Sequence, residues 1–387
     1  MIMGAKPARN IKPQVQNMLW GVAAGRCQFR GCNKPLWKNE ATNLQANIAQ
    51  KAHIWSFSDD GPRGNEGIAE EDINSIDNLM LVCHGCHKLI DDDLDGDTFS
   101  VQLLQGMKRQ HEHRVELVTS VEQNMKSHLL LYGANIGDQG AVLHFENTAA
   151  AMIPDYYPAS NLPLEISLKN SNFQDHDDFY WDLESKHLAK AFNEKVKPGI
   201  TSGAISHLSI FGLAPQPLLM KLGSLLTDIP EIRVFQRHRE PQTWKWQNNE
   251  SELHFILEVP KKPGEKIAIN LSLSASINND RIYRVLGDDV SIWTLTVDSP
   301  HRDLIRTEAQ LIMLRDKIRV VLDQIKRLAG DRKVLHVFPA MPVSAAIEFG
   351  RVHMPKADLS LRIYDQSKKR DGFIKAVDIG LEDGFDE

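Results

Sequence analysis

The spacing of apolar residues predicts a long helix at the end of the first third of the chain. Between Phe99 and His128 the apolar positions form two runs with steps of three or four residues: Val101, Leu104 and Met107, then Val115, Val118, Val121 and Met125. Such steps place side chains on one face of a helix, and only Gly106 weakens the pattern. We therefore expect a helix over 99–128 that closes a first domain.

A second pattern occurs twice in the later part of the chain. Residues 208–223 with 232–236, and 335–350 with 361–365, share an apolar run, a proline turn, a helical pattern and another apolar run. The matching positions are Phe211 with Phe338, Pro215 with Pro342, Gly223 with Gly350 and Arg233 with Arg362. Short apolar runs are typical of buried parallel strands, and proline fits a helix start. Unless the similarity is chance, the pattern predicts two related strand–helix–strand units, hence two similar α/β halves.

The rest of the second domain fits the same fold class, a mixed α/β protein. Residues 272–274 and 292–297 look like further strands, and 303–328 is a long helical stretch between the halves. In α/β sheets, ligands usually bind beyond the carboxyl ends of the strands. Two related halves would set two such ends facing each other, so we expect a cleft for a roughly twofold ligand. Helix N-termini in that cleft would suit phosphates.

Length and charge add the next constraint. The 387 residues carry a net charge of −6, so the whole chain has no general attraction for nucleic acid. The charges before His53 are nearly all basic, whereas those from Asp59 to Asp97 are mostly acidic. This contrast fits a phosphate-facing surface beside a metal site, and a solvated surface of mixed charge is the alternative.

The apolar runs indicate a protein without a membrane segment. None is long enough to cross a bilayer, and the apolar patch from Met18 to Ala24 is too short for a signal peptide. We therefore expect a cytoplasmic protein of two or three domains.

The four cysteines form two pairs, Cys27 with Cys32 and Cys83 with Cys86. Paired thiolates on tight turns present four soft ligands to a tetrahedral zinc ion. Disulfides compete with this interpretation, but a cytoplasmic compartment disfavours them. We expect a structural zinc ion that helps to fold a small domain.

Three further groups are interleaved with the cysteines: His53, Asn78 and His87. This His–Asn–His order resembles the HNH endonuclease family and its ββα-metal fold, over roughly the first third of the chain. The resemblance implies that His53 is the general base for an attacking water and that Asn78 holds its ring or supports the metal shell. It also implies that His87 binds a catalytic divalent cation, most simply Mg²⁺.

One position departs from that family. Many members carry Asp or His just before the general base, where this chain has Ala52. The missing metal ligand could be Asn78, His84 or Asp91, or DNA and water could complete the shell. The departure also leaves open a zinc-stabilised DNA-binding regulator without catalytic activity.

Four motifs stand out in the second domain, at 211–219, 236–239, 244–246 and 338–342. They resemble those of the SAVED domain, which consists of two fused CARF-like, Rossmann-type halves and binds cyclic oligonucleotides. The resemblance extends from about Asn147 to Asp365. The residues expected to contact the ligand, by type and position, are Tyr157, Phe211, Arg237, His238, Trp244, Arg302 and Ser344. Each of them could equally be structural.

Together the two resemblances imply an effector nuclease of a CBASS anti-phage system. We expect an HNH domain over 1–128, a linker over 129–146 and a SAVED domain over 147–387. The expected partners are double-stranded DNA and an activating cyclic dinucleotide, with a homo-oligomer that is dimeric at rest and larger when activated. A restriction-type HNH enzyme that reads modified DNA is the alternative.

Overall fold

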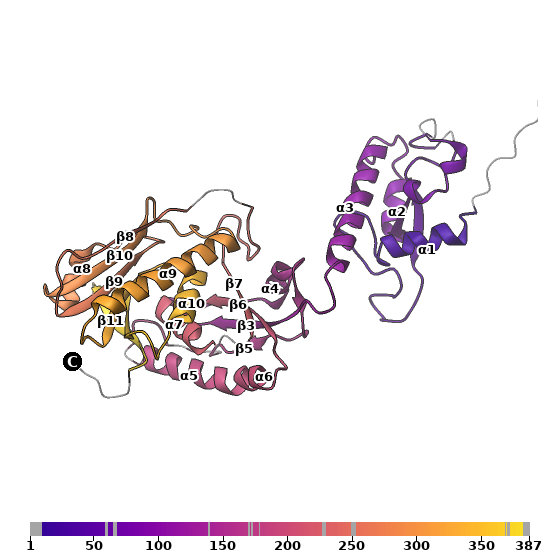
Figure 1. The fold of residues 1–387 in the computed structure, drawn as a ribbon. Coiled ribbons are helices and arrows are strands. Elements are labelled where there is room, and N and C mark those ends of the chain that lie inside the picture. The colour runs from indigo at the N-terminus through magenta and orange to yellow at the C-terminus, as the bar shows by residue number, and fades with distance from the viewer. Residues whose placement is uncertain are drawn as a thin grey trace, which may run out of the picture. The chain divides into compact units, whose positions relative to one another are not determined.

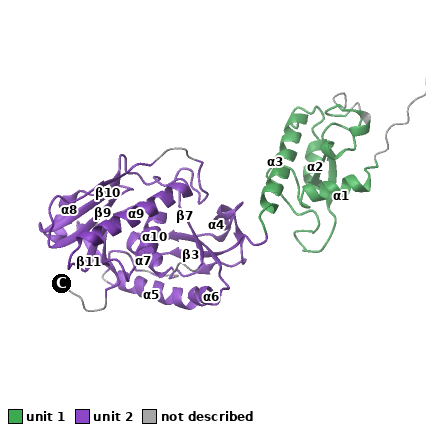
Figure 2. Ribbon diagram, viewed as in Figure 1, with its two compact units in different colours: residues 1–122 green, residues 123–387 purple. Residues whose placement is uncertain are grey.

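A computed structural model describes residues 10–58, 61–64, 68–137, 140–168, 171, 173–177, 179–226, 230–248, 253–367, 369 and 372–381. The chain divides into two compact units, residues 1–122 and 123–387 (Figures 1 and 2). Across the described residues, every helix is too short or too polar to cross a membrane.

The first unit is a small hairpin with helices around it. Its elements are α1 (Pro13–Val22), β1 (Ala49–His53), η1 (Glu70–Asp72), η2 (Ile76–Asn78), β2 (Leu79–Cys83), α2 (His84–Asp91) and α3 (Val101–Thr119). Strand β1 pairs antiparallel with β2, and His53 lies opposite Leu79. Helix α2 begins directly after β2, so strand, strand and helix follow in the order of a ββα unit. The four apolar residues from Leu79 to Val82 are buried and anchor β2 in the core of the unit.

The helix expected over 99–128 is confirmed as far as Thr119 and is wrong beyond that residue. Helix α3 ends at Thr119, and Lys126–Gly133 forms strand β3 of the second unit. The apolar run from Leu129 to Tyr132 is buried within a sheet, and this tertiary contact overrides the helical spacing. Residues 129–133, which we assigned to a linker, therefore belong to a central strand.

The first sheet of the second unit is parallel. Its strands follow the order β4 (Tyr157–Pro158), β3, β6 (His207–Leu213) and β7 (Glu231–Phe235), and β5 (Leu164–Glu165) also pairs with β3. The helices in this part of the chain are α4 (Phe145–Met152), α5 (Tyr180–Lys195), α6 (Lys197–Thr201) and α7 (Gln216–Leu225).

The second sheet is parallel at its centre and antiparallel at both edges. Its strand order is β13 (Gly372–Ile379), β12 (Ser360–Ser367), β11 (Val334–Ala340), β9 (Lys266–Ser272), β10 (Val290–Val297) and β8 (Phe255–Glu258). The accompanying helices are α8 (Asn279–Leu286), α9 (Glu308–Leu328) and α10 (Val343–Val352). Helix α9 begins at a capping box of Thr307 and Gln310, which explains why it starts later than residue 303.

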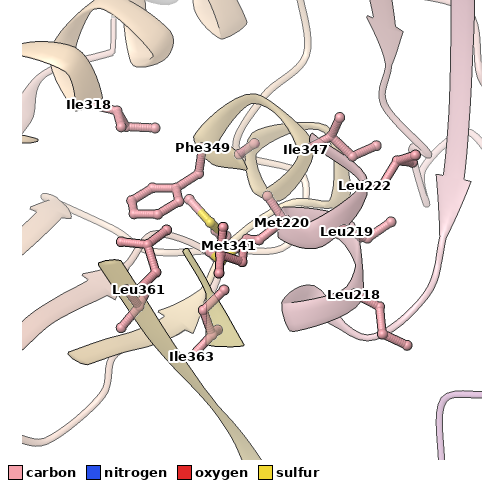
Figure 3. Packing of buried hydrophobic residues seen from close by; sticks show 14 of the residues in the cluster. Leu218, Leu219, Met220, Leu222, Ile318, Met341, Ile347, Phe349, Leu361 and Ile363 are labelled. Carbon is pink, nitrogen blue, oxygen red and sulfur yellow. The ribbon is translucent and has the colours of Figure 1, made fainter. Parts of the chain in front are cut away.

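The predicted repeat is present in the structure. The first copy forms β6, α7 and β7, the second forms β11, α10 and β12, and the two strands of each copy pair in parallel. Helices α7 and α10 pack together in the core, as Figure 3 shows for Met220 and Ile347. A Cβ atom at Gly223 would collide with the carbonyl oxygen of Ile347, and one at Gly350 with that of Met220. The equivalent glycines therefore make equivalent contacts, which places the α7–α10 crossing on a local twofold axis.

Candidate functional sites

The four cysteines lie together in the first unit. Their sulfur atoms are within 4.8 Å of one another, and the sulfurs of Cys32 and Cys83 are 3.8 Å apart. A tetrahedral zinc ion with Zn–S bonds of about 2.3 Å has sulfur–sulfur edges of about 3.8 Å. Burial raises the pKa of Cys27 to about 12 and also raises the pKa of Cys86, so four thiolates here need a cation to offset their charge. The donor set and its geometry fit zinc.

Hydrogen bonds hold the first cysteine pair against β2. The buried side chain of Gln28 accepts from the backbone N–H of Leu81 at 2.7 Å, and its amide donates to Glu112 of α3 at 3.0 Å. The backbone N–H of Cys83 donates to the sulfur of Cys27 at 3.3 Å. These bonds connect the cysteine cluster to the hairpin that carries His53.

His53 is the last residue of β1, where the strand gives way to a loop. Successive strand residues point to opposite faces, so Ala52 is buried in the core while His53 faces away from it. The Nε2 atom of His53 lies 3.0 Å from Oδ1 of Asn74. With this amide oxygen as acceptor, Nε2 carries the proton and Nδ1 carries the lone pair. Sequence reasoning missed Asn74, because no spacing rule connects it to His53.

Asn78 makes its contacts with the backbone. Its side-chain oxygen accepts from the N–H of Trp55 at 2.7 Å, and its amide donates to the carbonyls of Trp55 (3.2 Å) and Ile73 (2.9 Å). These bonds use both N–H groups and the oxygen of the amide. Asn78 therefore fixes the loop that follows His53, whereas the amide beside the imidazole ring is that of Asn74.

His87 lies on α2, one residue after Cys86, and Nδ1 of its ring is 2.9 Å from Oδ2 of Asp91. Both side chains are accessible, at 27% and 59% exposure. Imidazole and carboxylate are suitable ligands for a divalent cation. His84 is exposed at the start of the same helix. Because Asp91 lies within 2.9 Å of His87, it is the structure's best candidate for the second protein ligand.

Arg63 connects β1, which carries His53, to α2, which carries His87. Its guanidinium donates to the carbonyls of Ile54 at 2.7 Å, His53 at 3.4 Å and Ile90 at 3.3 Å. Burial lowers the pKa of Arg63, and Asp93 and Asp91 oppose this effect. One half-buried side chain thus fixes the end of β1 relative to the end of α2.

A pocket of about 310 Å³ opens at the carboxyl ends of the strands in the second unit. Equivalent positions of the two repeats line it in pairs: Ala214 with Met341, Pro215 with Pro342, Gln216 with Val343 and Gln236 with Asp365. Its remaining lining residues are Ile136, Leu213, Arg237, Arg239, Ser274 and Arg302. The pocket therefore lies on the twofold axis of the repeat, where the sequence predicted a cleft. The N-terminal turns of both α7 and α10 border it.

Of the seven residues predicted to contact a ligand, Arg237 and Arg302 line this pocket. Ser344 is buried beside it, and both its N–H and its hydroxyl donate to Oε1 of Gln236, at 3.1 and 2.7 Å. This pair of bonds holds the end of β7 against the start of α10.

The other four predicted residues lie outside the pocket lining. Phe211, Trp244 and His238 are buried, and the ring of Trp244 packs against Phe211 and beneath the guanidinium of Arg237. Trp244 therefore supports Arg237, which lines the pocket. Tyr157 pairs with Lys126 at the amino end of β3, whereas the pocket lies at the carboxyl ends of the strands. Its hydroxyl donates to the carbonyl of Gln123.

Asp365 is the one acidic residue among those lining the pocket. Burial and the neighbouring carboxylate of Asp175 raise the pKa of Asp365 to about 7. The sequence did carry a signal for this residue, because the repeat aligns it with Gln236. Gln216 also lines the pocket and was not predicted to do so. Its side-chain oxygen accepts from the N–H of Met341 in the other half at 2.9 Å.

Comparison with protein families identifies both units. Residues 27–94 match the family described as HNH endonuclease. Residues 188–379 match the family described as SMODS-associated and fused to various effectors sensor domain, or SAVED. The chain therefore carries an HNH endonuclease domain followed by a SAVED sensor domain. No curated protein sequence matches it.

Solved structures of Cap4 receptors, which contain a SAVED/CARF domain, are also similar to this chain. The Acinetobacter baumannii receptor with the cyclic trinucleotide 2′3′3′-cAAA is 14% identical, with a TM-score of 0.42, over 77% of this chain and 62% of that chain. The Moraxella osloensis receptor is 11% identical, with a TM-score of 0.39, over 81% of this chain and 66% of that chain. The chain spans less than two thirds of the length of either receptor.

Proposed function

We propose that this protein is a nuclease that cuts double-stranded DNA when a cyclic oligonucleotide binds to its sensor domain. The observation that carries the proposal is the pocket on the twofold axis. It combines two helix N-terminal turns with Arg237, Arg239 and Arg302, and it lies in a SAVED domain. Cationic groups and helix N-termini suit the phosphates of a cyclic ligand. The ligand is a cyclic dinucleotide in this proposal, and the protein acts in the cytoplasm as a CBASS anti-phage effector.

In the nuclease unit, His53 is the general base. Its Nδ1 atom takes the proton from the water that attacks phosphorus, while Asn74 holds the ring through Nε2. His87 and Asp91 hold a divalent cation such as Mg²⁺, which when bound shields the charge of the phosphate and of the leaving oxygen. Asn78 and Arg63 keep the strand and helix that carry these groups in place.

Ligand binding must change the state of the protein to gate this chemistry. A ligand shifts an equilibrium only by its differential affinity for two states, so it must favour the active assembly over the resting one. We propose that the resting protein is a dimer and that ligand binding produces a larger, active homo-oligomer.

Binding measurements on arginine variants test the assignment of the pocket. We expect Arg237→Ala and Arg302→Ala each to weaken binding of the preferred cyclic dinucleotide about tenfold or more, because a hydrogen bond to a charged group is lost. Arg284 is exposed on α8 and lies outside the pocket lining, so Arg284→Ala is the matched control. Unchanged affinity in the double variant at 237 and 302, measured by calorimetry, would place the ligand elsewhere.

The pKa of Asp365 predicts how ligand affinity depends on pH. The carboxyl is neutral below about pH 7 and ionised above it, and the ionised form repels a phosphate ligand. The other acid that acts on Asp365 is Asp175, and the basic residues that line the pocket with it are Arg237, Arg239 and Arg302. We expect affinity to fall about tenfold from about pH 6 to pH 8. The variant Asp365→Asn should lose this dependence, and a variant with the same pH profile as wild type would disprove the assignment.

A further inference from the structure

The first unit contains a second concave surface, and its lining includes none of the residues assigned above to the general base or to the catalytic cation. It has a volume of about 540 Å³ and lies between the first cysteine pair and α3. We call it the basic groove. It is lined by Cys27, Gln28, Phe29, Arg30, Gly31 and Asn33 on one side, and by Met107, Gln110, His111, His113, Arg114 and Leu117 of α3 on the other.

The charges of the basic groove have one sign. Its charged lining residues are Arg30 and Arg114, with no Asp or Glu, although the whole chain has a net charge of −6. Arg26 lies beside it, since Arg26 donates to the carbonyl of Asn33 at 3.2 Å and Arg114 donates to the side chain of Asn33 at 2.7 Å. Asn33 thus holds two guanidinium groups at one rim.

One acidic residue next to the groove, Glu112, is already neutralised. Its carboxylate pairs with Lys108 and accepts from Gln28, both within the unit. Burial lowers the pKa of His111, and the positive charges of Arg114 and Arg26 lower it further. The potential in the groove is therefore positive, and it favours an anionic occupant.

The floor of the groove is apolar. Phe29 and Met107 line it, and Leu117 is 40% exposed at its end. Guanidinium groups match phosphate geometry, and an apolar floor accommodates the sugar face of a nucleic-acid strand. An acidic peptide has the same sign of charge as DNA. In the proposed function, however, this unit already binds DNA as its substrate, so DNA is the occupant that we argue for.

From these observations we infer that the basic groove binds the phosphate backbone of the DNA substrate, as a contact separate from the reacting groups. This inference rests on the proposed function, because it presumes that the substrate is DNA. Arg30 and Arg114 supply the phosphate contacts, and they raise the affinity for DNA without taking part in the cleavage step.

Salt-dependent binding of a short fluorescent DNA duplex tests the inference. The full-length chain is used, with its activating ligand and with Ca²⁺ in place of Mg²⁺. We expect the double variant Arg30→Glu/Arg114→Glu to bind at least about tenfold more weakly, with the slope of log affinity against log salt reduced by about 2 for two lost phosphate contacts. With Mg²⁺, its KM for DNA should rise while kcat at saturating DNA is retained.

Two further variants keep the test decisive. Arg109→Glu changes the same charge at an exposed position of α3 outside the groove lining, and it should bind DNA nearly as wild type does. Because Arg114 also contacts Asn33 and His111, Arg30→Glu alone serves as a variant that leaves those contacts intact, and it should show about half of the slope change.

The outcomes separate this inference from the proposed function. If wild type binds and cuts DNA but the groove variants match it in affinity and slope, the groove is not a DNA contact and the proposed function stands. An equal loss in Arg109→Glu would also overturn the inference, because it would show only a general charge effect. A wild-type chain that binds no DNA in any condition would overturn both, and an acidic protein would then become the candidate occupant.

Discussion

Replacing His53 with alanine is expected to lower the rate of DNA cleavage by about 100-fold or more, the usual contribution of a general base. The variant lacks the imidazole that takes the proton from water in the proposed mechanism. Because His53 faces away from the core, the variant should keep its fold and its cyclic-nucleotide affinity. The measurement is the rate of plasmid cleavage at saturating activator and saturating DNA.

A histidine outside the site provides the control for this experiment. His144 is exposed in the second unit and lies outside the pocket lining, so His144→Ala should cut DNA as fast as wild type. Cleavage by His53→Ala at the wild-type rate would refute the assignment of the base. Loss of zinc or of ligand affinity in that variant would show that the substitution had damaged the fold.

Replacing Cys83 and Cys86 with serine is expected to release the metal and unfold the nuclease unit. Structural zinc contributes roughly 10–16 kcal/mol in small zinc domains, which matches or exceeds the whole stability of an ordinary domain, about 5–15 kcal/mol. The metal content should fall from one zinc per chain to none. Hydrogen exchange should then show loss of protection over α2 and α3, while residues of the second unit stay protected.

A chelator applied to the wild-type chain is the matching experiment without a mutation. Hydrogen-exchange protection in the first unit should be lost with chelation and return when Zn²⁺ is restored. Since all four cysteines belong to the cluster, no other thiol of the chain complicates the measurement. A zinc-free chain whose first unit stays protected would show that the cysteines have another role.

The sequence predicted the parts of this structure that depend on local or repeated patterns. The cysteine pairs have short spacings and meet in one cluster, and the repeat places Gly223 and Gly350 in equivalent helix contacts. The twofold position of the pocket followed from the same repeat, because equivalent strands end at equivalent places.

Contacts between residues that lie far apart in the chain could not be predicted from the sequence. The helix expected over 99–128 ends early because Leu129–Tyr132 belong to strand β3, which pairs with β6. The spacing of apolar residues cannot reveal such a pairing. Asn74 contacts His53 across 21 positions, through a fold that no motif encodes. Their aromatic rings suggested that Phe211 and Trp244 stack on a nucleobase of the ligand. Both side chains are buried instead, as large aromatic side chains often are.

The central claim is that a cyclic oligonucleotide in the twofold pocket controls DNA cleavage. The most direct measurement is plasmid degradation by the purified protein in Mg²⁺, with and without a panel of cyclic di- and trinucleotides, for wild type and for Arg237→Ala/Arg302→Ala. We predict that wild type cuts only when one member of the panel is present, and that the double variant needs far more of the same ligand. Cleavage by wild type that is equally fast with and without every ligand would contradict the account.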